Sequence, residues 1–312
     1  MRSQKRPILV RAILRWYSRQ GRTLPWRLPA GQAGSITNPY HILVSEIMLQ
    51  QTQVSRVLTK YPEFLHRFPS VKKLATAKQR EVVIAWRGMG YNNRAVRLHQ
   101  LAKTVVLKYG GTIPSSFEEL ITLPGIGRYT AHALLASAFR KDVPIVDVNV
   151  QRLFSRIFWR MKTTIDMRPV SEIWELAGEL VPKQRAYDWN QALMDLGATI
   201  CTARSPQCGT CPLAALCLSK SAMKRIMPSP RKQEPMRDGI PHRIYRGRII
   251  ETLRQHHGRK RLHPDAVGRT IHPEYSSKHR RWLESLLTGL VKDGLIRRST
   301  GRIWNEQRIR LA

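Results

Sequence analysis

Four cysteines crowd into one short segment of this chain and constrain how it folds. They are Cys201, Cys208, Cys211 and Cys217, spaced C-x6-C-x2-C-x5-C, and the 312 residues contain no others. So dense a quartet in a chain of this length argues against a disulfide framework and for a metal site with thiolate ligands. The fold must therefore bring these four sulfurs together in one loop.

The spacing of the cysteines favours an iron–sulfur cluster over zinc. Zinc sites with four cysteines usually use two separated C-x2-C turns, whereas this loop has only the pair Cys208 and Cys211. Single thiolates from separate stretches suit a cluster in which each cysteine meets a different iron. Zinc, or an inert set of buried cysteines, remains the alternative. Because such clusters need reduced thiols, we expect a cytoplasmic, nucleoid-associated protein.

The charge of the chain predicts a polyanionic partner. Its formal net charge is +33 and its isoelectric point is about 11.1, more than solubility requires. Nucleic acid is the first candidate and a membrane surface the second. No stretch approaches the roughly 20 apolar residues of a membrane-spanning helix, and Arg11 and Arg15 interrupt the apolar run after Arg6, which does not read as a signal peptide. We expect a monomer that binds DNA and no membrane.

Hydrophobic periodicity predicts an all-α protein up to the cysteine loop. Residues 6 to 217 alternate helical patterns with short polar breaks, and none of these patterns is typical of a strand. A basic stretch with three prolines follows at residues 219–238 and is typical of a linker.

The tail from Gly239 to Ala312 predicts a small winged-helix-like α+β domain. Helical patterns at 245–255, 265–271 and 277–293 precede a segment at 295–304 that alternates as a hairpin around Thr300-Gly301. Residues 237–312 hold 18 Lys and Arg against 7 Asp and Glu, and His279, Arg280 and Arg281 lie on the expected recognition helix. A dimerisation or docking module with the same fold is the alternative.

A glycine-rich turn at residues 123–130, Leu-Pro-Gly-Ile-Gly-Arg-Tyr-Thr, lies between two helical patterns. Gly125 and Gly127 permit close approach of a ligand to the backbone, and the free N–H groups of the second helix favour a phosphate. The pattern is that of a helix–hairpin–helix, although a lone P-G-x-G also fits an ordinary tight turn.

Two carboxylates stand in apolar surroundings. Asp147 lies in Val-Asp-Val-Asn-Val at 146–150, where it also fits the N-cap of a following helix, and Glu46 lies in an apolar helical run at 44–54. Burial favours the protonated form of one carboxyl group while a polar neighbourhood keeps another ionised, so the two predict a paired acid/base system.

These motifs together resemble those of MutY-type adenine DNA glycosylases. Residues 25–27, the Glu46 motif, residues 88–91, the glycine turn, Asp147 and the cysteines occur in the same order over about residues 10–217. The resemblance implies a helix–hairpin–helix glycosylase core at 1–218 that carries a [4Fe-4S] cluster. Within it, about 30–135 would form a six-helix barrel, and 1–29 with 136–218 a cluster-bearing domain, before the linker (219–238) and the winged helix (239–312).

The resemblance also implies roles for individual residues on mismatched duplex DNA. Glu46 would protonate the departing purine and Asp147 would stabilise the sugar cation, with Tyr129 and Asn149 positioning it. Residues that hold or wedge the duplex, or touch its backbone, would be Arg27, Gln50, Gln51, Tyr91, Gly125, Gly127 and Arg204. Tyr129 stands where endonuclease III-like relatives carry a lysine nucleophile, so we expect a monofunctional glycosylase without efficient strand cleavage.

Departures from the family pattern leave the target base open. Val148 stands where the adenine enzymes usually have glycine, and Asn92 replaces a common tyrosine. The winged helix occupies the place of the Nudix-like domain that reads 8-oxoguanine in those enzymes. Adenine removal opposite guanine or 8-oxoguanine is favoured by the run Gln50-Gln51-Thr52-Gln53, and removal of thymine or uracil opposite guanine is the alternative. A catalytically silent DNA-binding protein is disfavoured by the intact Glu46, Tyr129 and Asp147.

Overall fold

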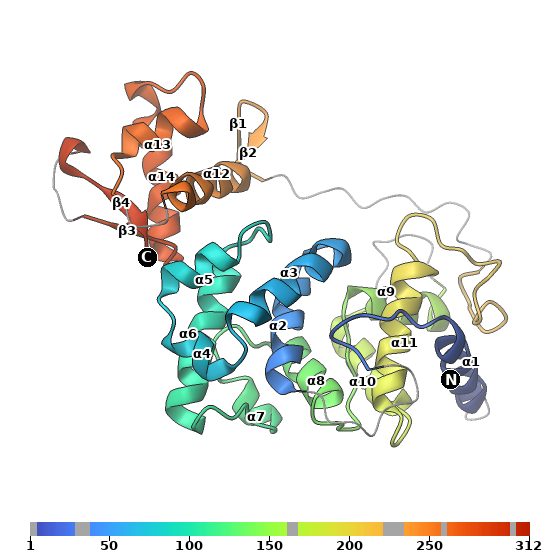
Figure 1. The fold of residues 1–312 in the computed structure, drawn as a ribbon. Coiled ribbons are helices and arrows are strands. Elements are labelled where there is room, and N and C mark those ends of the chain that lie inside the picture. The colour runs from blue at the N-terminus through green and yellow to red at the C-terminus, as the bar shows by residue number, and fades with distance from the viewer. Residues whose placement is uncertain (1–4, 29–37, 161–167, 221–233, 257–260, 300–303) are drawn as a thin grey trace. The chain divides into compact units, whose positions relative to one another are not determined.

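The computed structural model describes residues 5–28, 38–160, 168–220, 234–256, 261–299 and 304–312 (Figure 1). The chain divides into two compact units. The first unit comprises residues 1–43, 114–122 and 126–231, and the second comprises 44–113, 123–125 and 232–312. In the part of the chain that is described, no helix combines the length and the apolar character needed to cross a membrane.

The first unit is a helical assembly built around α11. Its helices are α1 (Lys5–Gln20), α7 (Phe117–Leu120), α8 (Arg128–Ser137), α9 (Val148–Phe158), α10 (Val170–Leu180) and α11 (Ala186–Thr199). Helix α11 contacts α1, α8 and α9 and is buried along most of its length, with polar as well as apolar side chains among its buried residues. Trp189 of α11 packs with Leu9, Ile13 and Phe154 in one apolar core. The cysteine loop follows α11 in the sequence and is therefore attached to this core.

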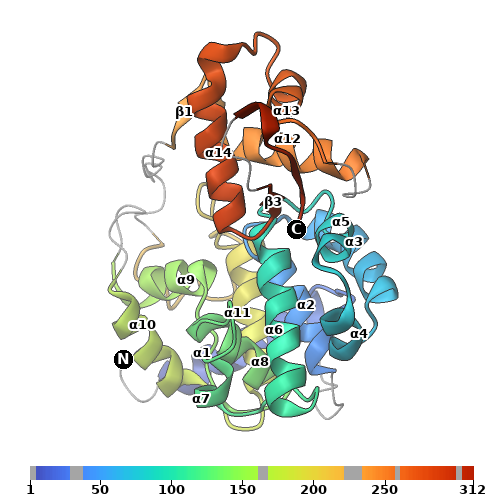
Figure 2. The same ribbon diagram turned by 90° about the vertical axis from the view of Figure 1, so that its left-hand side faces the viewer.

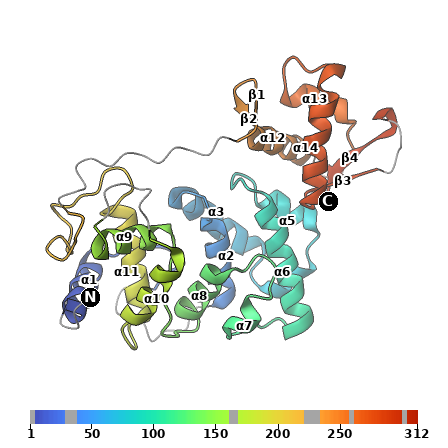
Figure 3. The same ribbon diagram turned by 180° about the vertical axis from the view of Figure 1, so that it is seen from behind.

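Short helices make up the N-terminal part of the second unit. They are the second half of α2 (Pro39–Leu49), α3 (Val54–Arg67), α4 (Val71–Thr76), α5 (Gln79–Ala85) and α6 (Asn93–Tyr109). Helix α6 packs against α4 and α5, and Figure 3 shows α5 and α6 from behind. It ends at Gly110, whose φ of 62° places it in the left-handed region that glycine adopts most readily.

The C-terminal part of the second unit combines three helices with two small strand pairs (Figure 2). The elements are β1 (Met236–Arg237), β2 (Ile240–Pro241), α12 (His242–Gln255), α13 (Pro264–Ile271), η2 (Ser277–His279), α14 (Arg280–Lys292), β3 (Ile296–Arg298), η3 (Trp304–Glu306) and β4 (Ile309–Leu311). The three helices contact one another, and α14 contacts β3. The expected fold class, an all-α core with a small α+β domain, is confirmed.

The C-terminal helices pack against α5 and α6 within this unit. Val83 and Val96 belong to the apolar core built by α12, α13 and α14. Arg254 of α12 donates to the carbonyl oxygen of Val83 at 2.7 Å and to Oδ1 of Asn92 at 2.8 Å. Apolar burial and these hydrogen bonds join the C-terminal helices to residues 44–113.

Parts of the sequence prediction for the C-terminal domain were wrong in detail. The strand that returns to β3 is β4 at 309–311, with Ile296 opposite Leu311, and not the segment that ends at Trp304. Trp304 instead donates its indole N–H to Asp265 at 2.9 Å. Pairing with residues 309–311 buries Ile309 and Leu311 in the core. The register predicted from the sequence, with a second strand that ends at Trp304, would not bury these two side chains. The expected turn at Thr300-Gly301 and most of the expected linker lie outside the described residues.

The start of the expected recognition helix also differs. His279 lies in the short helix η2, so α14 begins at Arg280. The guanidinium of Arg280 pairs with Asp265 at 2.7 Å and lies 5.6 Å from the ring centroid of Trp304. Arg280 therefore engages a carboxylate of its own domain.

Candidate active site

The turn between α7 and α8 presents backbone N–H groups at its surface. Gly127 is the N-cap of α8, and no side chain caps the helix there. Gly125 has a φ of 83°, and a Cβ at this position would lie 3.4 Å from Cβ of Arg97. Both glycines are exposed. The first N–H groups of α8 thus form a site with the polarity that attracts an anion such as phosphate.

Asp147 is held by hydrogen bonds at both of its carboxylate oxygens. It is the N-cap of α9, as the sequence indicated, and Oδ1 accepts from the backbone N–H of Val150 at 2.8 Å. Oδ2 accepts from Nδ2 of Asn149 at 2.7 Å. Because the two oxygens have different donors, the plane of the carboxylate is fixed.

A network of hydrogen bonds continues from Asn149 to the cysteine loop. Oδ1 of Asn149 accepts from Nη2 of Arg152 at 2.8 Å, and Nε of Arg152 donates to the carbonyl oxygen of Cys201, also at 2.8 Å. Arg152 donates further to the carbonyl of Gly197 at 2.6 Å. A Cβ on Gly197 would lie 2.6 Å from Cβ of Asn149, so this close approach requires glycine. Asp147 and the first cysteine are thereby joined through side chains of α9.

The cysteine loop has the features expected of a cluster site. All four cysteines are partly buried and line one hollow. Burial raises the pKa of Cys211 to about 11 and also raises the pKa of Cys217, so deprotonation there requires compensating positive charge such as iron. Arg156 is buried, and its Nη1 lies 3.3 Å from Sγ of Cys201. A buried guanidinium beside a thiolate is suited to an iron–sulfur cluster with net negative charge.

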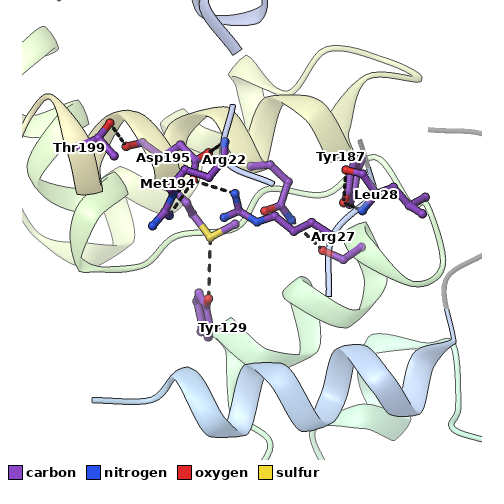
Figure 4. A network of polar contacts seen from close by, with 10 residues as sticks. Arg22, Arg27, Leu28, Tyr129, Tyr187, Met194, Asp195 and Thr199 are labelled. Carbon is purple, nitrogen blue, oxygen red and sulfur yellow. Dashed lines mark hydrogen bonds and ion pairs between the residues drawn. The ribbon is translucent and has the colours of Figure 1, made fainter. Parts of the chain in front are cut away.

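Tyr129 of α8 faces α11 (Figure 4). Its hydroxyl lies 3.9 Å from Sδ of Met194. The next residue, Asp195, is fully buried and forms ion pairs of 2.7 Å with both Arg22 and Arg27. The side chain of Arg27 is only 7% exposed. The resemblance assigned Arg27 to DNA binding. In the structure, the ion pair of Arg27 with Asp195 connects the segment after α1 to α11, the helix that Tyr129 faces.

Glu46 lies on α2, in the turn before its end, and is 9% exposed. The end of this helix is held by Arg94 of α6, a buried residue whose guanidinium donates to several backbone carbonyl groups. Nη1 donates to the carbonyls of Ile47, Met48 and Gln50 at 2.9, 3.0 and 2.5 Å. Burial lowers the pKa of Arg94 to about 10, so it remains a cation at neutral pH. Its charge also complements the partial negative charge at a helix C-terminus.

Gln51 and Tyr91 have strained backbone conformations in two loops of the second unit. Their φ angles are 53° and 43°, which non-glycine residues seldom adopt. The side chain of Tyr91 is 49% exposed. Arg94 joins the two loops, because Nη2 donates to Thr52 Oγ1 at 2.9 Å and to the carbonyl of Gly90 at 3.2 Å. Strain of this kind persists where the surrounding structure enforces it, often at binding sites.

A cavity of about 440 Å³ adjoins these two loops. Its walls combine amide side chains, arginines and one carboxylate from the two parts of the second unit. The polar residues that line it are Gln51, Arg56, Tyr91, Asn92, Asn93, Arg243, Arg246 and Asp293. Arg246 pairs with Asp293. The volume and the mixture of donors and acceptors are suited to a ligand of nucleotide size.

The two units divide the expected site residues between them. Asp147, Asn149, Tyr129 and the cysteine loop with the exposed Arg204 belong to the first unit, whereas Glu46, Gln50, Gln51 and Tyr91 belong to the second.

Comparison with known proteins identifies the family. Residues 44–178 match the HhH-GPD superfamily of base excision DNA repair proteins, and residues 201–217 match the iron–sulfur binding domain of endonuclease III. The adenine DNA glycosylase of Mycobacterium tuberculosis is 39% identical over 244 residues, which cover 78% of this chain and 77% of that protein. The chain belongs to the adenine DNA glycosylase family. The suspected resemblance is thus confirmed, and the match at residues 201–217, the segment that holds the four cysteines, supports the expected [4Fe-4S] cluster.

Solved structures agree with this membership of the adenine DNA glycosylase family at the level of the fold. A thermostable thymine-DNA glycosylase has a TM-score of 0.63 and 31% identity, with coverage of 70% of this chain and 97% of that one. An endonuclease III trapped on DNA has a TM-score of 0.61 at 23% identity, covering 72% of this chain and all of that one.

Sequence reasoning did not single out Arg94 and Arg152, which contact the candidate site residues or the backbone around them. Both are arginines in otherwise ordinary helical stretches, and their partners are mostly backbone carbonyl groups distant in the sequence. The one available signal was the spacing of three residues between Asn149 and Arg152, which places the two side chains on the same face of α9.

Proposed function

We propose that this protein removes adenine from mispaired duplex DNA by hydrolysing the N-glycosidic bond. The observation that carries the proposal is the oriented carboxylate of Asp147, which Asn149 and Arg152 tie to the iron–sulfur loop in a chain of the adenine DNA glycosylase family. A carboxylate fixed at both oxygens is suited to stabilising positive charge at a defined place.

The two carboxyl groups divide the chemistry. Glu46 donates a proton to the adenine ring, so the base departs as a neutral leaving group when the bond to C1′ breaks. Asp147 stabilises the resulting oxocarbenium-like sugar, and a water molecule supplies the hydroxyl group that completes hydrolysis. Tyr129 and Asn149 position the sugar and the carboxylate. The cluster, when bound, crosslinks the cysteine loop, and Arg204 of that loop contacts the DNA backbone.

Strand cleavage is not part of the proposed reaction. A lyase of this fold class needs an amine that attacks C1′ and forms a Schiff base, and the phenol of Tyr129 has none. The product is therefore an intact strand with an abasic site, which breaks only after treatment with alkali.

Specificity for a mismatch is supported by the cavity beside Gln51 and Tyr91. Flipping a base out of the duplex leaves its former partner unpaired, at a cost of a few kcal/mol that a mismatch reduces. Tyr91 fills the space that the flipped base leaves, and the amide and arginine groups of the cavity hold the unpaired partner. Because Arg243 of α12 lines this cavity, the C-terminal domain takes part in holding the unpaired base, although that domain does not have the Nudix-like fold.

A panel of duplexes tests the target base. Each carries A opposite 8-oxoguanine, A opposite G, T opposite G, or U opposite G, and is treated with alkali after incubation. We expect the strand to break at adenine. At limiting enzyme concentration, we expect less breakage with the Arg243→Ala variant than with the parent. Breakage at thymine or uracil would support the alternative glycosylase, which the thymine-DNA glycosylase structure at 31% identity favours. No breakage in any duplex would leave a silent DNA-binding protein.

A further inference from the structure

The β3–β4 hairpin carries a pair of arginines that face each other across the strands. In the antiparallel register, Arg297 lies directly opposite Arg310. Their neighbours Ile296, Ile309 and Leu311 are buried, so the alternation of the strands places both arginines on the outer face of the hairpin. Like charges directly opposite in a sheet repel and destabilise the pairing. An anion bound between the two arginines would offset this repulsion.

Further cations surround this pair in two adjoining hollows. One hollow, of about 140 Å³, is lined by Arg261, Arg298 and Arg308 with the central pair. The other, of about 380 Å³, adds Lys78, the N-cap of α5, with Arg80 of α5 and Lys103 of α6. Among the described residues that line them, every ionisable side chain is a lysine or an arginine.

One arginine that lines the smaller hollow, Arg298, is paired with an acidic residue. Arg298 forms an ion pair of 2.5 Å with Glu284 of α14. Within the described ranges, no carboxylate lies within ion-pairing distance of Arg297 or Arg310. On α14, by contrast, the first arginine, Arg280, forms an ion pair with Asp265.

We propose that this surface, defined by Arg261, Arg297, Arg308, Arg310, Lys78, Arg80 and Lys103, binds the phosphate backbone of duplex DNA through residues other than those assigned to base excision. Phosphates spaced along a strand match a row of cations that extends over two hollows, and their negative charge removes the repulsion between Arg297 and Arg310. The domain thus contacts DNA through its hairpin and not through its recognition helix. The inference rests on the proposed function only in taking DNA as the partner.

The test compares two variants of the full-length, cluster-loaded protein that lose the same charge. One is Arg297→Ala with Arg310→Ala. The control is Arg269→Ala with Lys278→Ala, which removes two cations of the same domain from outside both hollows. The dissociation constant for a long duplex without any mismatch is measured over a range of salt concentrations, so adenine removal is not required for the readout.

We expect the hairpin variant to bind more weakly and to lose about 0.9 from the logarithmic salt slope for each phosphate contact removed. The control should keep the parental slope. An unchanged slope in the hairpin variant would overturn the proposal, as would a loss of slope in Arg281→Ala, on α14, that equals or exceeds it. A surface for free phosphate ions would also leave the DNA affinity of the hairpin variant equal to that of the parent.

A third variant separates binding from folding. Arg297→Glu places opposite charges across the strands at the position of Arg310, and we expect a higher Tm together with weaker DNA binding. A higher Tm with unchanged DNA affinity would overturn the proposal, because the repulsion between the two arginines would then be removed without any effect on DNA binding.

Discussion

The side-chain amide of Asn149 donates a hydrogen bond of 2.7 Å to the carboxylate of Asp147. Asp147 is the N-cap of α9 and Asn149 lies in its first turn, and Arg152 donates to the amide oxygen of Asn149. Asn149 therefore links the carboxylate of Asp147, a candidate catalytic group, to Arg152, the arginine that contacts the iron–sulfur loop.

Replacing Asn149 tests whether this hydrogen bond orients Asp147. We expect Asn149→Ala to lower the single-turnover rate of adenine release by about a hundredfold, because a small displacement of a catalytic group costs that much. Binding to mismatched DNA should be nearly unchanged. A rate close to that of the parent would show that the N-cap bond from Val150 is sufficient to orient the carboxylate.

Replacing Arg152 tests the link to the iron–sulfur loop. Arg152→Gln removes donors to the carbonyls of Gly197 and Cys201, so we expect a lower iron content in the purified protein and faster loss of its visible absorbance in air. Arg152→Lys keeps the charge without the forked geometry and should be intermediate. Parental iron content in Arg152→Gln, with slower adenine release, would confine the role of Arg152 to Asn149.

Arg94 holds the end of α2 through backbone carbonyls. Arg94→Leu leaves several of these carbonyls buried without a donor, so we expect the free energy of unfolding to fall by at least about 3 kcal/mol. The matched control is Arg97→Leu on the exposed face of the same helix, with an expected change within about 0.5 kcal/mol. Chemical denaturation measures both. Equal stability of the two variants would contradict a structural role for Arg94.

Asp265 makes the stability of the C-terminal domain depend on pH. Although burial opposes this, hydrogen bonds from Arg280, Tyr275 and Trp304 lower the pKa of Asp265 from 3.8 to about 2. A lowered folded-state pKa contributes stability that is present above pH 3.8 and is lost as the pH falls towards 2.

We therefore expect Asp265→Asn to lower the unfolding free energy at pH 6 by about 1–2 kcal/mol, with a smaller difference from the parent near pH 2. Thermal unfolding at several pH values checks this. Glu274→Gln, at an exposed position of the same domain, is the control. A difference that does not change with pH would show that packing, not ionisation, accounts for the loss.

Features that depend on local sequence were predictable. The N-cap role of Asp147 follows from its place before an amphipathic helix, and the iron–sulfur loop at 201–217 follows from the cysteine spacing. The turn around Gly125 was predictable because few other residues adopt its backbone conformation.

Features that depend on distant partners were not predictable. The resemblance assigned Arg27 to DNA, and nothing near Arg27 in the sequence indicated that Asp195 is its ion-pair partner. The second strand of the hairpin was misplaced because Trp304 fits an alternating pattern, whereas its indole N–H is satisfied by Asp265 of α13. In each case a partly buried polar group has a partner that is distant in the sequence.

Adenine release by Glu46→Gln under single-turnover conditions tests the central claim most directly. The substitution keeps the shape of the side chain and removes its acidic proton. With iron content and affinity for A opposite 8-oxoguanine equal to those of the parent, we predict that adenine release falls at least about a hundredfold, within the range that general acid catalysis contributes. Release at the parental rate would contradict the assignment of Glu46 as the acid and, with it, the proposed reaction.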